Sequence, residues 1–333
     1  MLEGDCMKAV VLNKTCCASD LKVSEVPIPK VKDNWVLIKV IGFGINRSEI
    51  ILRDYEADED YINLPVIPGI ECVGEVINPS NCNFNKGDKV VALMGGMGRT
   101  FNGSYAEYTL IPDKNLFKID DEVFKSLSIE EIISIPETCF TAFGSIESLK
   151  LKKDDTFLIR GATSTTGITA IQLAKALGVT VIATSRNKNK FDILKEYGAD
   201  YTLTDDGNLE SKIKKIFPDG VSKILELIGP KTLEDSMKCL KIGGICCNTG
   251  ILGGDEYISQ FDPIKIIPNN CYLTSFFSNY PTQEIIDKLF NFIITNKIEI
   301  KISKTFHSLE DISDAHELME SNDANGKIIV RLL

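Results

Sequence analysis

Residues 156–186 read TFLIRGATSTTGITAIQLAKALGVTVIATSR, and their pattern indicates the fold class of the chain. An apolar run ends at Arg160, a turn of small residues follows as far as Gly167, and a second apolar run starts at Thr180. The pattern predicts a strand, a tight turn, a helix over 167–177 and a second strand. The backbone N–H groups of such a turn, at the positive end of a helix, can bind a pyrophosphate.

The turn departs from the usual G-x-G-x-x-G fingerprint, because Ser164 stands where the second glycine would lie. A short hydroxyl side chain fits at that place and can donate to phosphate. A turn of small residues is often merely structural, but the strand–turn–helix–strand context favours a dinucleotide site. We expect the cofactor contacts of this turn to come from Ser164, Thr165, Thr166, Gly167 and Ile168.

The end of the second strand indicates which cofactor binds. Some 20 residues beyond the phosphate turn, enzymes that use NAD place an Asp or Glu on the ribose hydroxyls. This chain has Ser185, Arg186, Lys188 and Lys190 there, with no carboxylate among them. The cations could merely solvate a helix start, but they would then face the positive end of its dipole. We therefore predict NADPH, with Ser185, Arg186 and Lys190 among its contacts.

The rest of the chain divides by its pattern. Short apolar or alternating runs separated by Gly, Pro, Asn and Asp fill the stretch from Lys8 to about Pro112. From Thr156 strands alternate with helices, which requires crossover connections and a doubly wound parallel sheet. We predict an α/β fold in which that sheet domain, residues 126–279, is inserted into a β-rich domain formed by residues 1–125 and 280–333.

The amino-acid composition limits the classes of partner that we expect for this chain. The 333 residues are 44% hydrophobic and 25% charged, typical of a globular protein with a large core. The net charge of -10 opposes binding to a phosphate backbone, so nucleic acid is not expected. No run approaches the roughly 18 apolar residues of a membrane span. We expect a cytoplasmic protein with no membrane partner.

Cysteine and histidine do not point to a metal. The ten cysteines include the adjacent pairs Cys16-Cys17 and Cys246-Cys247, and no C-x-x-C occurs. We interpret them as reduced thiols. The only histidines, His307 and His316, lie in a polar, helical stretch near the C-terminus and are expected at the surface.

Several further motifs carry a resemblance over residues 7–333. They are MKAVVL, GINRSEI, PVIPGIECVGEV, GDKVVAL, GSYAEYTLIP, PETCFTAF, LKIGGICCNTG and GKIIV. With the phosphate turn they make the chain resemble the medium-chain dehydrogenase/reductase superfamily, most closely its quinone-oxidoreductase-like branch. The resemblance implies that the β-rich domain is a GroES-like catalytic domain and that the inserted domain is a Rossmann domain.

The resemblance allows a test for zinc, position by position. Asn46 occupies the place of the cysteine ligand of the family's alcohol dehydrogenases, and Ile70 occupies the place of the histidine. Glu137 falls near the third place, and Glu71 is the one acidic residue next to Ile70. An amide and an aliphatic side chain cannot replace a thiolate and an imidazole in a tetrahedral site. We expect no metal.

The reaction follows from that expectation. Without a Lewis acid, alcohol oxidation is difficult, whereas quinones and α,β-unsaturated carbonyls accept hydride directly from nicotinamide. We predict an NADPH-dependent quinone reductase acting on a small-molecule acceptor. A 2-alkenal or enone reductase is the nearest alternative. A non-catalytic NADPH-binding sensor or structural protein is the alternative of another class, and an alcohol dehydrogenase ranks below both.

The resemblance also suggests roles for single residues. It places Asn46 beside the nicotinamide ribose or the substrate oxygen, although Asn46 can also be a plain turn residue. Tyr55, on a polar loop, can donate a hydrogen bond or a proton to the reduced acceptor, or simply lie at the surface.

The nicotinamide end of the cleft is expected to use residues from two other segments. Thr141 is expected to touch the nicotinamide, and Gly250 with Ile251 to approach the cofactor after a strand. Phe276 and Phe277 can form a wall of the cleft or belong to the core. Relatives form dimers through an edge strand, and residues 271–277, CYLTSFF, provide an apolar one, so we expect a homodimer.

Overall fold

The computed structural model describes residues 5–255, 257–321 and 323–333. They form two compact units. The first contains the described residues up to Glu137, with Asn279–Thr295 and Glu299–Leu333, and the second contains Thr138–Ser278 and Asn296–Ile298. The chain therefore leaves the first unit and returns to it, as an inserted domain requires. Packing groups residues 126–137 with the first unit, and the domain limits at 125 and 279 stay predictions.

The second unit is built on a parallel sheet. Its strands are β8 (Thr156–Arg160), β9 (Thr180–Ser185), β10 (Tyr201–Thr204), β11 (Val221–Glu226), β12 (Leu240–Asn248) and β13 (Tyr272–Ser275). All neighbours pair in parallel, in the order β10-β9-β8-β11-β12-β13. This is the 3-2-1-4-5-6 order of the doubly wound dinucleotide-binding sheet. The predicted fold class is confirmed.

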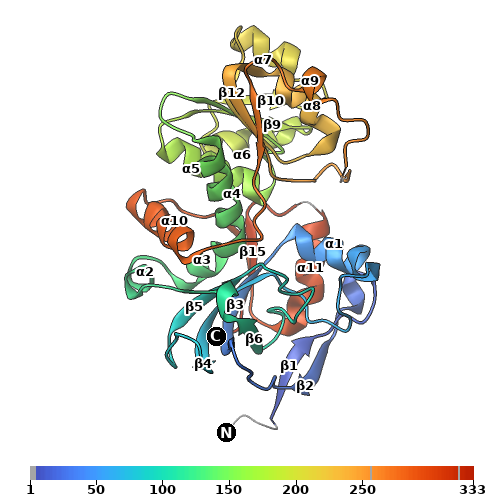
Figure 1. The fold of residues 1–333 in the computed structure, drawn as a ribbon, viewed down its shortest axis with the longest axis vertical. Coiled ribbons are helices and arrows are strands. Elements are labelled where there is room, and N and C mark those ends of the chain that lie inside the picture. The colour runs from blue at the N-terminus through green and yellow to red at the C-terminus, as the bar shows by residue number, and fades with distance from the viewer. Residues whose placement is uncertain (1–4, 256, 322) are drawn as a thin grey trace. The chain divides into compact units, whose positions relative to one another are not determined.

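Helices cover both faces of this sheet. They are α4 (Pro136–Leu149), α5 (Thr165–Ala176), α6 (Phe191–Glu196), α7 (Glu210–Ile216), α8 (Pro230–Lys238) and α9 (Pro263–Ile266). In Figure 1, α5 and α6 lie on one side of the strands and α8 on the other. Helix α5 contacts β8 and β9, while α8 contacts β11 and β12. Right-handed crossovers that run in opposite directions from β8 require this arrangement.

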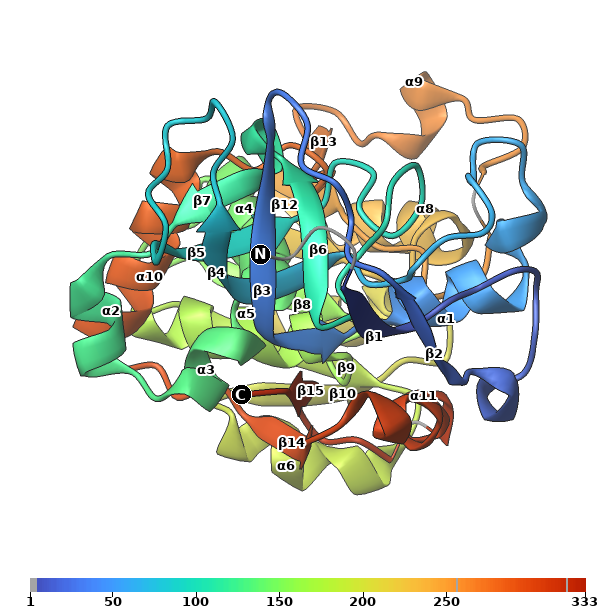
Figure 2. The same cartoon turned by 90° about the horizontal axis from the view of Figure 1, so that it is seen from below.

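The first unit is mostly β-structure. Its strands are β1 (Cys6–Val10), β2 (Val23–Pro27), β3 (Trp35–Ile45), β4 (Glu71–Asn78), β5 (Lys89–Leu93), β6 (Tyr108–Pro112), β7 (Leu116–Lys118), β14 (Ile302–Phe306) and β15 (Lys327–Arg331). The long strand β3 lies between β4 and β6 in Figure 2. Beyond β6, the second half of β3 pairs with β15. The C-terminal segment therefore completes a sheet that the N-terminal segment begins.

Short helices flank this sheet. They are α1 (Arg47–Asp54), α2 (Asp121–Ser126), α3 (Ile129–Ser134), α10 (Gln283–Thr295) and α11 (Ile312–Ser321). The break between α3 and α4 falls at Pro136, which is tolerated there because it is the first residue of its helix. Among the described residues, no helix is long and apolar enough to cross a membrane.

A buried histidine corrects one expectation from the sequence. His316, on α11, is 1% exposed, so the expectation that it lies at the surface is wrong. Its Nε2 lies 3.0 Å from the hydroxyl of the buried Tyr105, whose ring stacks on Phe43. Burial, with a contribution from Arg53, lowers the pKa of His316 to about 3. The folded protein therefore holds this imidazole in its neutral form.

We predict that His316 makes the fold sensitive to acid. Its folded pKa lies below the ordinary value of 6.5, so its contribution to stability is complete above pH 6.5 and is lost as the pH falls toward 3. At about pH 5 the loss should be about 2 kcal/mol. Urea unfolding at about pH 7.5 and about pH 5 measures this effect as a difference: between the two pH values the wild type should lose about 2 kcal/mol of stability relative to His316→Gln.

His307→Gln is the matched control, because His307 is the other histidine of the chain and is exposed. This variant should keep the wild-type loss of stability between the two pH values. If the wild type and His316→Gln lost equal stability on acidification, the assignment of the effect to His316 would be refuted.

Candidate functional site

The turn between β8 and α5 is shaped by two glycines. Gly161 has a φ of +82°, in the left-handed region that favours glycine. A Cβ on Gly167 would lie 2.7 Å from the Cα of Ala162, so a side chain there would collide with backbone. Because neither glycine carries a side chain, the backbone at Gly167 can pack closely against Gly161 and Ala162 at the start of the helix. The geometry is that of a turn whose backbone can approach a phosphate.

Ser164 caps this helix from within the turn. Its Oγ accepts the Gly167 N–H at 3.1 Å and donates to the Gly161 carbonyl at 2.9 Å. The hydroxyl proton that we expected to reach phosphate is thus directed inside the turn. Helix α5 begins at Thr165, two residues before the predicted start. The N–H groups of Thr165 and Thr166 precede the intrahelical bonds and fit an anionic ligand such as a pyrophosphate.

The end of β9 presents free positive charge. Ser185 is buried and its hydroxyl bonds the backbone N–H and carbonyl of Asn187. Arg186 and Lys188 are exposed, and neither has an ion-pair partner among the described residues. Lys190 is half-buried. The two exposed cations are therefore available to a phosphate group.

Helix α4 connects two of the predicted nicotinamide contacts. Thr141 is buried on α4, and its carbonyl accepts the hydroxyl of Ser145 at 2.7 Å. The Ser145 Oγ also lies 2.8 Å from the Oγ1 of Thr249, the residue before Gly250. The structure therefore brings the segments of Thr141 and Gly250 together within the second unit. Ile251, the next residue, is partly exposed.

Phe276 packs against the same helix. Its ring meets the ring of Phe140 edge-on, with centroids 5.4 Å apart. A Cβ on Gly144 would lie 2.0 Å from the Phe276 ring, so this glycine leaves the space that the ring fills. Phe277, by contrast, is exposed. The structure thus gives Phe276 a packing role beside α4, and its contact with a cofactor stays a prediction.

In the first unit, Asn46 belongs to a buried polar cluster. It is 7% exposed and precedes the first residue of α1. Its Oδ1 accepts from the Lys327 ammonium at 2.5 Å, and its Nδ2 donates to the Glu71 carboxylate at 2.9 Å. Lys327 and Glu71 form an ion pair at 2.7 Å. The amide is therefore held in one orientation by a cation on one side and an anion on the other.

A second carboxylate completes this cluster. Glu49 accepts the N–H of Asn46 at 2.8 Å and that of Ile70 at 3.1 Å. Burial, reinforced by Glu71, raises the pKa of Glu49 to about 7. Burial would lower the pKa of Lys327, but the carboxylates around it, Glu71 first, raise the pKa above its usual value. Near neutral pH the Glu49 carboxyl group is thus partly protonated beside the Lys327–Glu71 ion pair.

The cluster requires a glycine on β3. A Cβ on Gly44 would lie 2.3 Å from both the Glu71 Oε1 and the Lys327 Cε. Gly44 also faces Ile329 of β15 in the register of the sheet. The missing side chain therefore creates the space in which Lys327 and Glu71 meet.

Two family models match separate parts of the chain. Residues 32–121 match the model described as alcohol dehydrogenase GroES-like domain. Residues 165–294 match the model described as zinc-binding dehydrogenase.

Curated relatives cover most of the chain. A quinone oxidoreductase of Sus scrofa is 30% identical over 252 residues, which are 74% of this chain and 71% of the relative. A quinone oxidoreductase of Homo sapiens is 28% identical over 93% of this chain and 92% of its own length. An acryloyl-coenzyme A reductase of Sulfurisphaera tokodaii is 27% identical over 98% of this chain and 100% of its own length. This chain belongs to the medium-chain dehydrogenase/reductase superfamily, among its quinone-oxidoreductase-like members.

Solved structures agree on the fold. The quinone oxidoreductase from Coxiella burnetii is 26% identical with a TM-score of 0.81, covering 99% of this chain and 100% of that one. A mycobacterial protein complexed with NADPH is 23% identical with a TM-score of 0.81, covering 98% and 99%. This medium-chain oxidoreductase therefore has the GroES-like β domain with an inserted Rossmann sheet that the sequence predicted.

The donor atoms of this superfamily member do not fit a tetrahedral zinc ion. Ile70 offers an aliphatic side chain, and the amide oxygen of Asn46 faces the Lys327 ammonium, which would repel a metal cation. Among residues 5–255, 257–321 and 323–333, no group of three or more His, Cys, Asp or Glu side chains is placed to hold a metal.

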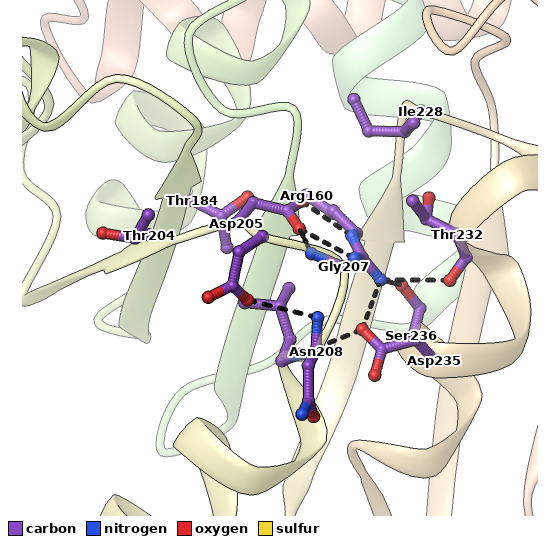
Figure 3. A network of polar contacts seen from close by, with 12 residues as sticks. Arg160, Thr184, Thr204, Asp205, Gly207, Asn208, Ile228, Thr232, Asp235 and Ser236 are labelled. Carbon is purple, nitrogen blue, oxygen red and sulfur yellow. Dashed lines mark hydrogen bonds and ion pairs between the residues drawn. The ribbon is translucent and has the colours of Figure 1, made fainter.

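Several of the buried charged residues of this oxidoreductase were not identified from the sequence. Glu49 and Lys327 were not singled out, although each is a charged residue within or beside an apolar stretch. Arg160 was likewise overlooked at the end of TFLIR, yet it is fully buried in the network of Figure 3. A charge inside a hydrophobic run is the signal that could have found them, since buried charges need partners. Tyr55 is 50% exposed, and its role as a proton donor stays a prediction.

We predict that the cluster depends on its single ammonium. Lys327→Met should lower the free energy of unfolding by about 3–5 kcal/mol, because it leaves Glu71 buried without its counter-ion. The double variant Lys327→Met/Glu71→Gln should recover part of that loss, since no buried charge is then left unpaired by the substitution. Urea unfolding measures both effects.

Lys304→Met is the control, because Lys304 is exposed on β14, the strand next to β15. This substitution should change stability by less than about 0.5 kcal/mol. If Lys327→Met were as mild as Lys304→Met, the ion pair would not be needed for stability.

Proposed function

We propose that this chain catalyses the NADPH-dependent reduction of quinones, or of related electron-poor carbonyl compounds, by hydride transfer without zinc. The Lys327–Asn46–Glu71 cluster is the observation that carries the proposal. A neutralised internal ammonium takes the place where the family's alcohol dehydrogenases have metal ligands. Such a cluster cannot lower the pKa of an alcohol as a metal does, whereas a quinone needs no Lewis acid to accept hydride.

The second unit provides the groups that would hold the cofactor. The first turn of α5, with Thr165, Thr166, Gly167 and Ile168 after the capping Ser164, suits the pyrophosphate. The cations at the end of β9, Arg186 first, suit a 2′-phosphate, with Ser185 and Lys190 beside it. The complex of the mycobacterial relative with NADPH is in keeping with this choice.

The proposed nicotinamide contacts are Asn46, Thr141, Gly250, Ile251 and Phe276. The bound nicotinamide would supply the hydride. Asn46, fixed by Lys327 and Glu71, has a rigid amide to present, and rigid groups orient a substrate at a small entropic cost. Phe276, fixed against α4, would exclude water.

Reduction of a quinone by hydride also takes up a proton. Tyr55 is our proposed donor of that proton, and its exposed position lets water replace the proton that it gives up.

Reduction of enones is the second candidate. The acryloyl-coenzyme A reductase that matches 98% of this chain favours it, because that relative's named substrate has a carbon–carbon double bond conjugated with a carbonyl. Both reactions use the same donor and differ only in the acceptor. Turnover on benzoquinone compared with a linear 2-alkenal separates them.

We also propose a homodimer formed through β13. Among the described residues this strand pairs only with β12, so its other edge is open. Tyr272 on β13 is exposed, and so is Ile242 on β12. Pairing with a second copy would cover an edge that otherwise invites aggregation.

Oxidation of NADPH, followed by its absorbance, tests the proposed reaction. We expect turnover with benzoquinone, slower turnover with a 2-alkenal, and none with a simple aldehyde. Turnover with the 2-alkenal alone would favour the enone reductase. Tight NADPH binding without oxidation by any acceptor would refute catalysis and favour a sensor or structural role.

We predict that Arg186 selects the phosphorylated cofactor. Arg186→Gln should lower kcat/KM for NADPH by about 10- to 100-fold, the worth of a charge-assisted hydrogen bond, and should leave NADH almost unaffected. Lys195→Gln is the control, because Lys195 is an exposed cation further along, on α6. Equal losses with both cofactors would contradict a contact between Arg186 and the 2′-phosphate.

A further inference from the structure

Arg160 is a fully buried cation directly before the phosphate turn. It ends β8, and Gly161 follows it. Its guanidinium binds the Asp205 carboxylate through two parallel hydrogen bonds. Nε donates to Oδ2 and Nη2 donates to Oδ1, each at 2.8 Å. Asp205 follows the last residue of β10, and Figure 3 shows its carboxylate against the guanidinium. This bidentate geometry is the strongest form of an Arg–carboxylate pair.

The remaining nitrogen of Arg160 binds α8. Its Nη1 donates to the Asp235 carboxylate at 2.8 Å, to the Ser236 hydroxyl at 3.0 Å and to the Thr232 carbonyl at 3.0 Å. Asp235 also accepts the N–H of Leu209 at 3.0 Å, just before α7. One guanidinium therefore fixes two carboxylates and has no nitrogen left for a ligand.

The pair lies at the strand end where we place the adenosine phosphate. Strand β9 runs between β8 and β10, so the pair spans the end of β9. The Asp205 N–H donates to the Ser185 carbonyl at 3.0 Å, and Thr204 is the register partner of Ser185. Asp205 is thus a carboxylate beside Ser185 and Arg186, in the region where an NAD enzyme binds the ribose hydroxyls with an acid.

Both oxygens of this carboxylate are occupied. Oδ2 accepts from Arg160, and Oδ1 accepts from Arg160 and from the Gly207 N–H at 3.1 Å. A carboxylate held in this way is turned toward the guanidinium, which also pairs with Asp235. Its oxygens are therefore poorly placed to bind a ribose hydroxyl, and the guanidinium beside it weakens its repulsion of a phosphate.

We propose that Arg160 determines cofactor specificity by sequestering Asp205, so that the chain prefers NADPH to NADH. The inference rests on the proposed NADPH dependence and names a residue that acts on it without touching the cofactor. Arg160 is a positioning residue, and its effect passes through Asp205. Lysine cannot replace it, because an ammonium lacks the planar fork that occupies both oxygens.

The test compares cofactor binding in four proteins without any acceptor. Calorimetry gives the Kd of NADPH and of NADH for the wild type, Arg160→Lys, Asp205→Asn and Arg160→Lys/Asp205→Asn. Arg160→Lys should reduce the preference for NADPH by about tenfold or more, because it partly frees the carboxylate. The double variant should restore the preference to within about threefold of the wild type, because no free carboxylate remains.

Asp205→Asn keeps the inference testable if Arg160→Lys does not fold. Because the wild-type carboxylate is sequestered, the asparagine variant should bind NADH within about twofold of the wild type. A tenfold loss of NADH affinity in this variant would show that Asp205 contacts the ribose, and would overturn the inference.

Two further outcomes separate the inference from the proposed function. An equal loss of affinity for both cofactors in folded Arg160→Lys would show a purely structural role for Arg160 and would overturn the inference alone. A wild type that binds neither cofactor would overturn the proposed function, and the inference with it.

Discussion

A charge buried away from water must be paired. In the first unit, the ion pair between Lys327 and Glu71 satisfies this constraint and ties the C-terminal segment to the sheet. Lys327 begins β15 and Glu71 begins β4, so the pair joins the C-terminal segment of the first unit to its N-terminal segment. Gly44 leaves the space for it on the strand between them. The C-terminal segment therefore has an electrostatic reason, besides its apolar residues, to return to the sheet that the N-terminal segment begins.

The second unit satisfies the same constraint with Arg160. There the cation ends the first strand of the parallel sheet, and its partners are Asp205, directly after β10, and Asp235, within α8. The Arg160 ion pairs and the Ser164 cap thus both fix the end of the sheet from which the phosphate turn leaves. Each unit has a buried cation paired with carboxylates next to the groups that we assign to the ligand, and each cation fixes the positions of its partners.

The sequence was sufficient for the fold because periodicity is a local signal. Apolar runs and turn residues predicted the strands and helices around residues 156–186, and the phosphate turn placed them in one topology. The buried clusters could not be predicted in this way, because Asn46 and Lys327 are separated by 281 positions and meet only through the pairing of β3 with β15. The burial of His316 could not be predicted from the sequence either. Its helical pattern contains polar residues, and the pattern does not reveal that one of them contacts the buried Tyr105.

The Lys327 cluster also explains how this site can stay ordered without metal ligands. A zinc ion holds its ligands by coordination, and its removal alone would leave buried donors unsatisfied. Here the ammonium, two carboxyl groups and an amide satisfy one another, and Glu49 takes up two backbone N–H groups as well. The result is rigid but electrically balanced, so it can orient a substrate and cannot polarise one strongly. That difference is the basis of our proposal that the acceptors are electron-poor before they bind.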